Sequence, residues 1–216
     1  MITSTSSSQV KHVVNLQKKA KLRKEEKQFV VEGVKMVSEA PADRLVKVYV
    51  SETFKADNEE FLERMNYDSI GKDVLEIVTD NVFMRMADTQ TPQGIMAVVR
   101  MSDTDLEGIL SDKRNPLLLI IENLQDPGNL GTIVRMAEGA GVTGIIMSSN
   151  TVDIYNPKTI RSTMGSLYRV PVIYVDDICE AADVCKSKGV TVYAAHLNGT
   201  DTVSYTHLTL PTICSV

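Results

Sequence analysis

The spacing of apolar residues divides the chain into two parts with different patterns. In the first 100 residues, apolar positions alternate with polar ones over short stretches or recur at helical spacing. These patterns predict strands at 28–31, 46–51, 74–78 and 95–99. They predict helices at about 9–19, 33–40, 57–65 and 80–87, the last capped by Asp80. The first part therefore predicts a small α/β domain over residues 9–100.

The second part has continuous apolar runs instead of alternating ones. After a polar linker at 101–115 with a short helix near Leu106, the apolar runs fall at 117–121, 142–147, 171–175 and 190–195. Helical stretches are expected between them, at about 129–140, 157–167 and 177–188. Strands that are buried on both faces and separated by helices are typical of a parallel α/β sheet.

The charge distribution suggests a local contact with a polyanion. The formal net charge is −5, which argues against a uniformly basic surface. Between residues 11 and 27, however, only Glu25 and Glu26 oppose a group of basic side chains. This basic segment consists of Lys11, Lys18, Lys19, Lys21, Arg23, Lys24 and Lys27. Any polyanionic partner would meet this patch.

Other compositional features exclude several classes of protein. The three cysteines are odd in number and, like His12, His196 and His207, lack metal-ligand spacing, so we expect neither a disulfide framework nor a metal site. The polar N-terminus has no apolar signal-peptide core, and no apolar run approaches the length of a membrane span. The sequence predicts a cytoplasmic protein without a membrane partner.

Candidate chemistry is concentrated in the segment that follows the run at 117–121. In a parallel sheet, ligands bind beyond the carboxyl ends of the strands. Gly128 and Gly131 would permit tight turns or the close approach of another group. Asn129 is placed to cap the next helix, and Arg135 follows near a helix terminus that attracts anions. An ordinary loop with a capping Asn and a solvated Arg remains an alternative.

A second glycine pattern, Gly139-Ala-Gly-Val-Thr-Gly144, matches the spacing found in dinucleotide-binding folds. It follows a predicted helix and precedes a predicted strand, which is the reverse of the required context. We interpret it as a helix C-cap and turn, which argues against a nucleotide-dependent oxidoreductase.

The stretch LIIENLQDPGNLGTIVRMAEGAG, residues 119–141, closely resembles the first signature of the SpoU/TrmH-type RNA 2′-O-methyltransferases of the SPOUT superfamily. Further similar stretches follow the family's order. They are KKAKLRKEEKQFVVEG at 18–33, TPQGIMAVV at 91–99, NPKTIRSTMGSLYRVPV at 156–172 and AAHL at 194–197.

The resemblance implies a small N-terminal α/β substrate-binding domain and a parallel-sheet methyltransferase domain of the trefoil-knot type at 116–202. It implies S-adenosylmethionine as cofactor, RNA as partner, with ribosomal RNA preferred over transfer RNA, and a homodimer. Arg135 becomes the catalytic arginine and Asn129 its partner. Glu122, Gly128 and Gly131 support the motif, and Ala195 corresponds to a cofactor-contacting position.

Within this resemblance the basic segment is assigned to RNA phosphates, through Lys18, Lys19, Lys21, Arg23 and Lys24. A solvated helix face is the alternative. Arg161 is assigned to RNA as well, with a contact to a partner subunit or a structural salt bridge as open alternatives.

Residues 203–216, VSYTHLTLPTICSV, depart from the family pattern. They contain no glycine and no charged Asp, Glu, Lys or Arg side chain, whereas the family continues with two cofactor-binding loops. We interpret this stretch as a non-native tail, which makes the methyltransferase domain incomplete and predicts weak cofactor binding. A non-catalytic RNA-binding protein on a methyltransferase scaffold is the competing function.

Overall fold

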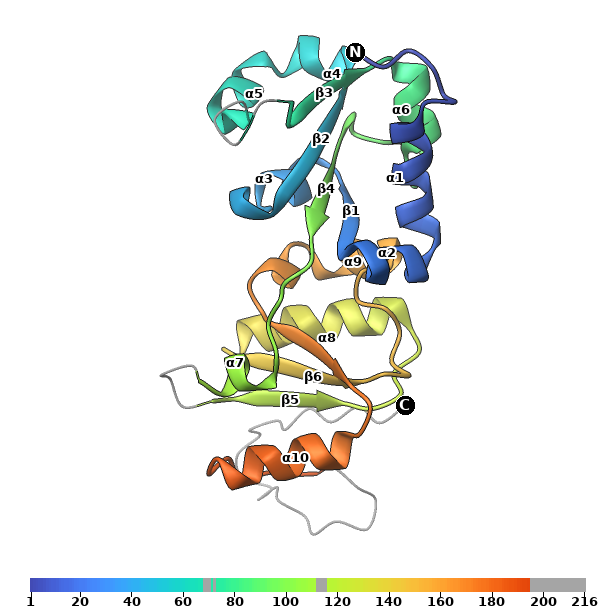
Figure 1. The fold of residues 1–216 in the computed structure, drawn as a ribbon. Helices are drawn as coiled ribbons and strands as arrows, with labels where there is room; N and C mark the ends of the chain where they lie inside the picture. The colour runs from blue at the N-terminus through green and yellow to red at the C-terminus, as the bar shows by residue number, and fades with distance from the viewer. Residues whose placement is uncertain (68–70, 72, 112–115, 195–216) are drawn as a thin grey trace.

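A computed structural model describes residues 1–67, 71, 73–111 and 116–194. The described residues form two β-sheets, one above the other in Figure 1. We refer to residues 1–100 as the N-terminal domain and to the elements from residue 106 onward as the C-terminal domain.

The N-terminal domain contains a mixed four-stranded sheet in the order β1-β4-β2-β3. Its strands are β1 (Gln28–Glu32), β2 (Leu45–Ser51), β3 (Leu75–Val78) and β4 (Ile95–Arg100). β4 pairs antiparallel with β1 and β2, and β2 pairs parallel with β3. All four strands predicted for this part are therefore confirmed, with their ends shifted by one residue or less.

Helices cover both faces of this sheet because its strands alternate buried side chains. Met96 and Val98 of β4 pack with α1 (Ser8–Lys18) and α6 (Asp80–Met86). Ile95, Ala97 and Val99 belong to the apolar cluster that includes α3 (Val34–Ser38), α4 (Glu52–Asp57) and α5 (Glu59–Met65). The remaining short helices are α2 (Ala20–Glu26) and the 3₁₀ turn η1 (Ala42–Arg44).

Two helix predictions in this domain require correction. The helix expected at 57–65 begins at Glu59, as α5, and is preceded by an unpredicted helix, α4, that ends before Asn58. Asp80 does not cap α6, because Thr79 is the N-cap residue and Asp80 is already helical. The Asp80 carboxylate instead accepts hydrogen bonds from the backbone N–H and hydroxyl of Thr53, which lower its pKa.

The C-terminal domain contains the predicted parallel sheet, in the order β5-β6-β7. Its strands are β5 (Leu118–Ile121), β6 (Gly144–Ser148) and β7 (Val172–Val175). α8 (Pro127–Gly139), α9 (Pro157–Thr163) and η3 (Ser166–Tyr168) lie between this sheet and the N-terminal domain (Figure 1). α7 (Leu106–Leu110) and α10 (Ile178–Ser187) pack on the opposite face. The α/β fold class is confirmed.

A fourth strand at 190–195 was predicted, but residues 190–194 form no strand. The amide of Val190 donates to the Cys185 carbonyl and so closes the turn that ends α10, instead of pairing with a neighbouring strand. Ala195 and the stretch 203–216 lie outside the described residues.

One apolar cluster joins the two domains. It includes Phe29 and Val31 of β1 as well as Leu130 and Val134 of α8. The ring of Phe29 lies 4.7 Å from that of Tyr155, measured between centroids. Among the described residues, no helix has the length and apolar content needed to cross a membrane.

Candidate functional site

The segment that follows β5, residues 122–126, leads from the carboxyl edge of the sheet into α8. We call it the catalytic loop, after the role that the family resemblance predicts for its motif. Its turn is made by Asn123, which has a left-handed backbone with a φ of +52°, and the Asn123 amide donates to the Ser148 hydroxyl at 2.9 Å. Neither Gly128 nor Gly131 has a positive φ, so the expectation that they form tight turns is not met.

The start of α8 also differs from the prediction. Asp126 is the N-cap residue, and its carboxylate accepts a hydrogen bond of 2.6 Å from the backbone N–H of Asn129. The helix therefore begins at Pro127, a residue well suited to the first helical position. Asn129 does not cap the helix, and only its backbone N–H takes part in the cap. The Asp126 carboxylate occupies the helix terminus at which we expected an anion.

Arg135 is the ninth residue of α8, about 12 Å along the axis from its first residue. The field of a helix terminus decays within about one turn, so Arg135 lies beyond its reach. Glu122, Asn129 and Arg135 are all exposed. Arg135 forms no ion pair with any of the described residues. Its guanidinium is thus available to an external anion.

Gly131 allows α8 to pack closely against α9. A Cβ atom at this position would lie 2.2 Å from the Cβ of Ser162 and 2.9 Å from its carbonyl carbon. The expected close approach of another group is therefore confirmed for Gly131, and the group is a neighbouring helix. At Gly128 the nearest atom to such a Cβ is the Asp126 carboxylate, at 3.1 Å.

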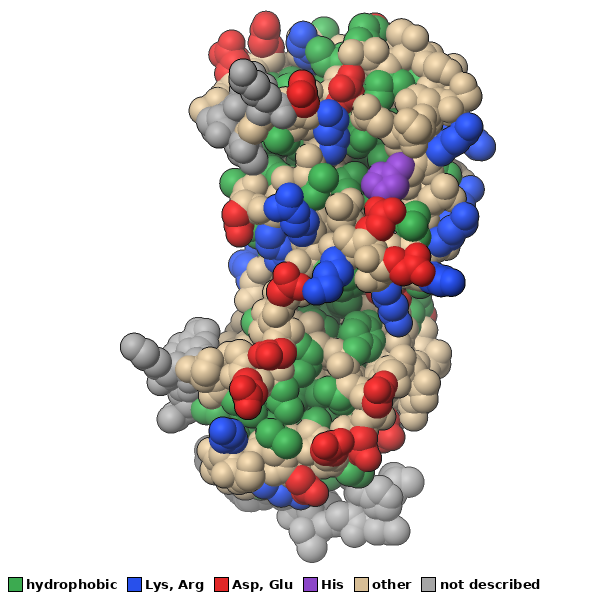
Figure 2. Space-filling model, in the orientation of Figure 1, with side chains coloured by type: hydrophobic (Ala, Val, Ile, Leu, Met, Phe, Trp, Pro, Cys, Tyr) green, Lys and Arg blue, Asp and Glu red, His purple; other side chains and the backbone are tan. Residues whose placement is uncertain are grey.

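Most of the basic segment is exposed on α1 and α2. Lys18, Lys19, Lys21 and Lys24 are all exposed, and Lys21 lies 3.8 Å from Glu25. On the face shown in Figure 2, basic side chains lie along the edge formed by α1 and α2 and also across the middle of the molecule, whereas most of the charged side chains in the C-terminal half are acidic. The chain thus combines a negative net charge with exposed basic side chains on this edge.

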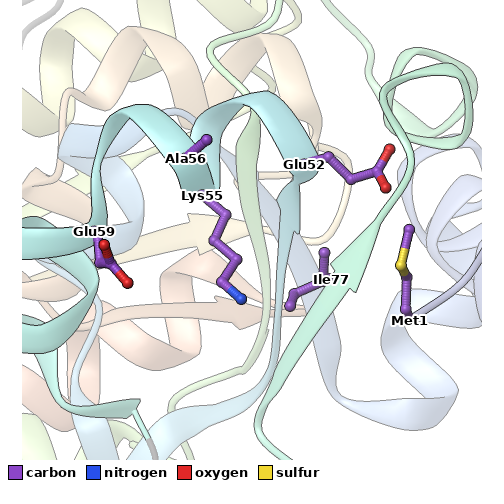
Figure 3. Close-up of a pocket in the computed structure, with 6 residues that line it drawn as sticks. All are labelled: Met1, Glu52, Lys55, Ala56, Glu59 and Ile77. Carbon is purple, nitrogen blue, oxygen red and sulfur yellow. The ribbon is translucent and has the colours of Figure 1, made fainter.

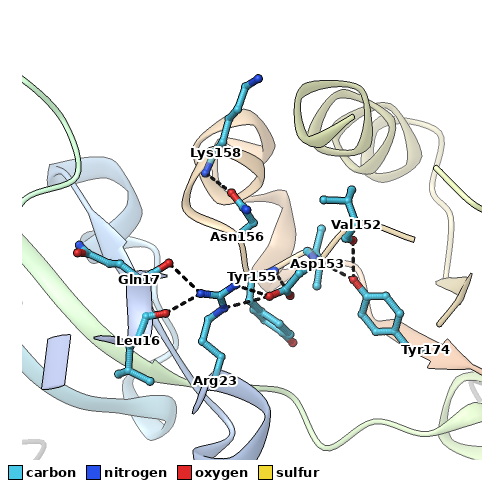
Figure 4. Close-up of polar contacts among 10 residues, drawn as sticks. Leu16, Gln17, Arg23, Val152, Asp153, Tyr155, Asn156, Lys158 and Tyr174 are labelled. Carbon is cyan, nitrogen blue, oxygen red and sulfur yellow. Dashed lines mark hydrogen bonds and ion pairs between the residues drawn. The ribbon is translucent and has the colours of Figure 1, made fainter. Parts of the chain in front are cut away.

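Arg23 is the exception, and its assignment to RNA is corrected. Its side chain is only 3% exposed. It donates to the carbonyls of Leu16 and Gln17 and forms an ion pair with Asp153 of the C-terminal domain at 2.6 Å (Figure 4). A guanidinium with these partners cannot reach an RNA phosphate. The burial of Arg23 could not be predicted from its neighbours, because its partner Asp153 is 130 residues away in the sequence.

Two further arginines join the domains at the surface. Arg161 of α9 pairs with Asp88 at 2.6 Å, which supports the structural salt bridge among its predicted alternatives. Arg169 pairs with Glu39 at 2.7 Å and also with Glu138 of α8. This arrangement lowers the pKa of Glu138, mainly through its hydrogen bond with Arg169.

The larger of two open hollows found among the described residues lies away from this region. This hollow, of about 350 Å³, lies at the far end of the N-terminal domain (Figure 3). It is lined by Met1, Glu52, Lys55, Ala56, Glu59 and Ile77. The lining is a mixture of two carboxylates, one ammonium and apolar groups, without a recognisable chemistry. Within the described parts of the chain, no cluster of His, Cys, Asp and Glu could hold a metal ion.

Comparison with known proteins identifies the family to which this chain belongs. The model of the SpoU rRNA Methylase family matches residues 116–214, and that of the MRM3-like substrate binding domain matches residues 7–97. An uncharacterized tRNA/rRNA methyltransferase of Synechocystis is 30% identical over 221 residues, covering 98% of this chain and 76% of that protein. The chain belongs to the SpoU rRNA methylase family.

Further relatives of the SpoU family agree in sequence and in fold. The Bacillus subtilis protein named 23S rRNA (guanosine(2553)-2′-O)-methyltransferase is 35% identical over 127 residues, which cover 56% of this chain. The chain spans less than half of the length of that relative, 46%. The crystal structure of an rRNA methyltransferase from Sinorhizobium meliloti superimposes with a TM-score of 0.76 and 25% identity, covering 93% of this chain and 74% of that one.

Proposed function

We propose that the full-length protein transfers a methyl group from S-adenosylmethionine to a ribose 2′-hydroxyl of RNA, with ribosomal RNA as the substrate. The observation that supports this most strongly is the exposed, unpaired guanidinium of Arg135 on the first helix after the catalytic loop of a SpoU-family domain. The names of the relatives support the substrate class and the position of methylation.

In this proposal Arg135 acts as a cation and not as a base. A 2′-hydroxyl is a weak nucleophile that must lose its proton as it attacks. A guanidinium has a pKa above about 12 and does not accept that proton at neutral pH. Arg135 instead holds a backbone phosphate and stabilises the developing alkoxide, and the phosphate or a water accepts the proton. Asn129, exposed near the start of the same helix, orients the ribose.

S-adenosylmethionine is proposed as the cofactor because it is the methyl donor of the SpoU family. When bound, S-adenosylmethionine supplies an electrophilic methyl group. An open α/β sheet binds its ligands at the carboxyl edge of its strands, and the catalytic loop with its exposed Glu122 lies at this edge of β5, β6 and β7. These residues suit the RNA-facing side of the reaction. The residue assigned to the cofactor, Ala195, lies outside the described residues.

RNA binding is proposed for Lys18, Lys19, Lys21 and Lys24, with Arg23 removed from the set. α8 begins on the side of the molecule where α1 and α2 lie (Figure 1), so RNA phosphates held by these lysines would lie on the side of the catalytic loop. A homodimer and a cytoplasmic location remain proposals that rest on the family resemblance and on composition.

The test is methyl transfer to ribosomal RNA by the full-length protein, measured with a labelled methyl donor. Arg135→Ala should lower kcat/KM at least about 100-fold, the scale for losing one such donor in the transition state. Met136→Ala is the matched control, because Met136 is the neighbouring side chain on α8 and is 51% exposed. Near-normal turnover by Arg135→Ala would reject the role of Arg135.

The competing function is a non-catalytic RNA-binding protein. Asn129 and Arg135, the two residues that the family resemblance assigns to catalysis, are both present and exposed, which favours the enzyme. The glycine pattern at 139–144 gives no support to the oxidoreductase alternative, since Gly139 ends α8 and Gly144 begins β6, as the turn interpretation predicts.

A further inference from the structure

The loop between β6 and α9 contacts two distant functional regions at once. We call residues 149–156 the bridging loop. It follows Ser148, the last residue of β6, and ends at Asn156, which caps α9 by accepting from the amide of Lys158 at 2.9 Å. One part of the loop contacts the catalytic loop, and another contacts the helices that carry the proposed RNA-binding lysines.

The first contact joins the bridging loop to the catalytic loop. The Val152 amide donates to the Leu124 carbonyl at 2.8 Å. The side chain of Gln125 donates to the Asn150 carbonyl, also at 2.8 Å. Together with the bond from the Asn123 amide to the Ser148 hydroxyl, these bonds hold three consecutive residues of the catalytic loop.

The second contact joins the bridging loop to the corner between α1 and α2. Both Nε and Nη2 of Arg23 donate to the same carboxylate oxygen of Asp153, at 3.0 and 2.6 Å (Figure 4). The remaining nitrogen of the guanidinium, Nη1, donates to the carbonyls of Leu16 and Gln17 in the last turn of α1. A guanidinium is rigid and planar, so this set of bonds fixes the helix corner relative to Asp153.

Hydrogen bonds stiffen the bridging loop between these two contacts. The hydroxyl of Tyr174 accepts from the amide of Ile154 and donates to the carbonyl of Val152, both at 2.8 Å (Figure 4). The other carboxylate oxygen of Asp153 accepts from the amide of Tyr155 at 2.9 Å. These bonds fix the residues on either side of Asp153 relative to it. A displacement of Asp153 would therefore also move Val152 and, through its hydrogen bond, Leu124.

We propose that Asp153 is a positioning residue that couples the placement of the RNA-binding helices to the catalytic loop through the bridging loop. This inference rests on the proposed function for its catalytic consequence. The pairing of Arg23 with Asp153 helps to fix the orientation in which RNA held by Lys18, Lys19, Lys21 and Lys24 meets the catalytic loop. Small misplacements of a bound substrate lower the rate steeply, because the reacting atoms must be close and aligned.

The test compares Asp153→Asn with Asp88→Asn in the full-length protein. Both changes remove the carboxylate of an arginine pair that joins the two domains at 2.6 Å, but Asp88 does not contact the bridging loop. Asp153→Asn should lower kcat about tenfold and leave the Kd for ribosomal RNA within about twofold, because the lysines are intact. Asp88→Asn should leave both quantities within about twofold.

Hydrogen exchange provides a readout that does not depend on activity. In Asp153→Asn the amides of residues 122–126 should exchange at least about fivefold faster, whereas Asp88→Asn should not change them. Gln125→Glu is a second variant, to be used if Asp153→Asn does not fold. It alters an exposed side chain, leaves the buried pair intact and replaces the donor to the Asn150 carbonyl with an acceptor. It should also lower kcat and speed exchange in residues 122–126.

The inference is overturned if exchange in the catalytic loop is unchanged, or if kcat and RNA affinity fall together and equally in Asp153→Asn and Asp88→Asn. The second result would mean that the pair only holds the domains together. Failure of the proposed function has a different signature, which is the absence of methyl transfer by the unmodified protein. In that case the exchange comparison still decides whether the two regions are coupled.

Discussion

At the scale of single residues, Gly131 has no room for a side chain larger than its hydrogen atom. Gly131→Ala should lower the free energy of unfolding by about 1–3 kcal/mol, the range for overpacking a close contact. The added Cβ would lie within 3 Å of both the side chain and the backbone of Ser162, so α8 and α9 must separate. Urea unfolding measures this change.

Gly139→Ala is the matched control for that prediction. Gly139 is in the same helix, and nothing lies within 4 Å of the position that its Cβ would occupy. Alanine is a better helix former than glycine, so this change should leave stability unchanged or raise it by up to about 1 kcal/mol. Equal effects of the two substitutions would show that helix propensity, and not the contact with Ser162, determines the outcome.

Residue types were predicted from the sequence better than residue partners were. Asn129 and Arg135 were selected by their motif, and both are exposed as a site requires. Arg23 was grouped with its basic neighbours, because a run of like charges does not show which member points inward. Its burial depends on Asp153 and on the carbonyls of Leu16 and Gln17, contacts that form only when both domains are folded.

At the scale of elements, the start of α8 depends on one carboxylate. Asp126→Ala should cost about 1 kcal/mol of stability, because it removes the acceptor for the Asn129 amide. Asn129→Ala should cost less, since only the backbone of Asn129 takes part in that bond. Asp126→Asn should keep most of the stability, because an Asn side chain also caps helices well. Thermal unfolding of the three variants provides the comparison. A larger loss in Asn129→Ala would contradict the observed cap.

Elements with a strong internal pattern were predicted, and those that depend on neighbours were not. The seven strands observed in the described residues all fall on predicted apolar runs. The run at 190–194 also combines apolar and β-branched residues but forms no strand, and the Val190 amide donates to the Cys185 carbonyl at the end of α10 instead. The short helix α4 was missed, and α5 begins two residues later than predicted, since apolar spacing alone does not define the ends of such short helices.

At the scale of the whole molecule, the two sheets share one apolar cluster and three arginine pairs. Two α/β domains joined by a linker would ordinarily unfold independently. Here the contact between Phe29 and Tyr155 and the hydrogen bond from the Tyr168 hydroxyl to the Met36 carbonyl, at 2.9 Å, link the cores directly. We therefore expect the lysines on α1 and α2 and the catalytic loop to move as parts of one body.

This predicts that the domains unfold together. Native-state hydrogen exchange at increasing urea should give the amides of β4 and β6 the same free energy of opening and the same urea dependence. Tyr155→Leu removes the ring contact with Phe29, worth about 0.5–1.5 kcal/mol beyond its buried area, and should separate the two openings. Tyr193→Leu, at a side chain that is 85% exposed, should not separate them. If β6 opens well before β4 in the unmodified protein, the domains are independent, and the orientation of bound RNA relative to Arg135 must be set by the RNA itself.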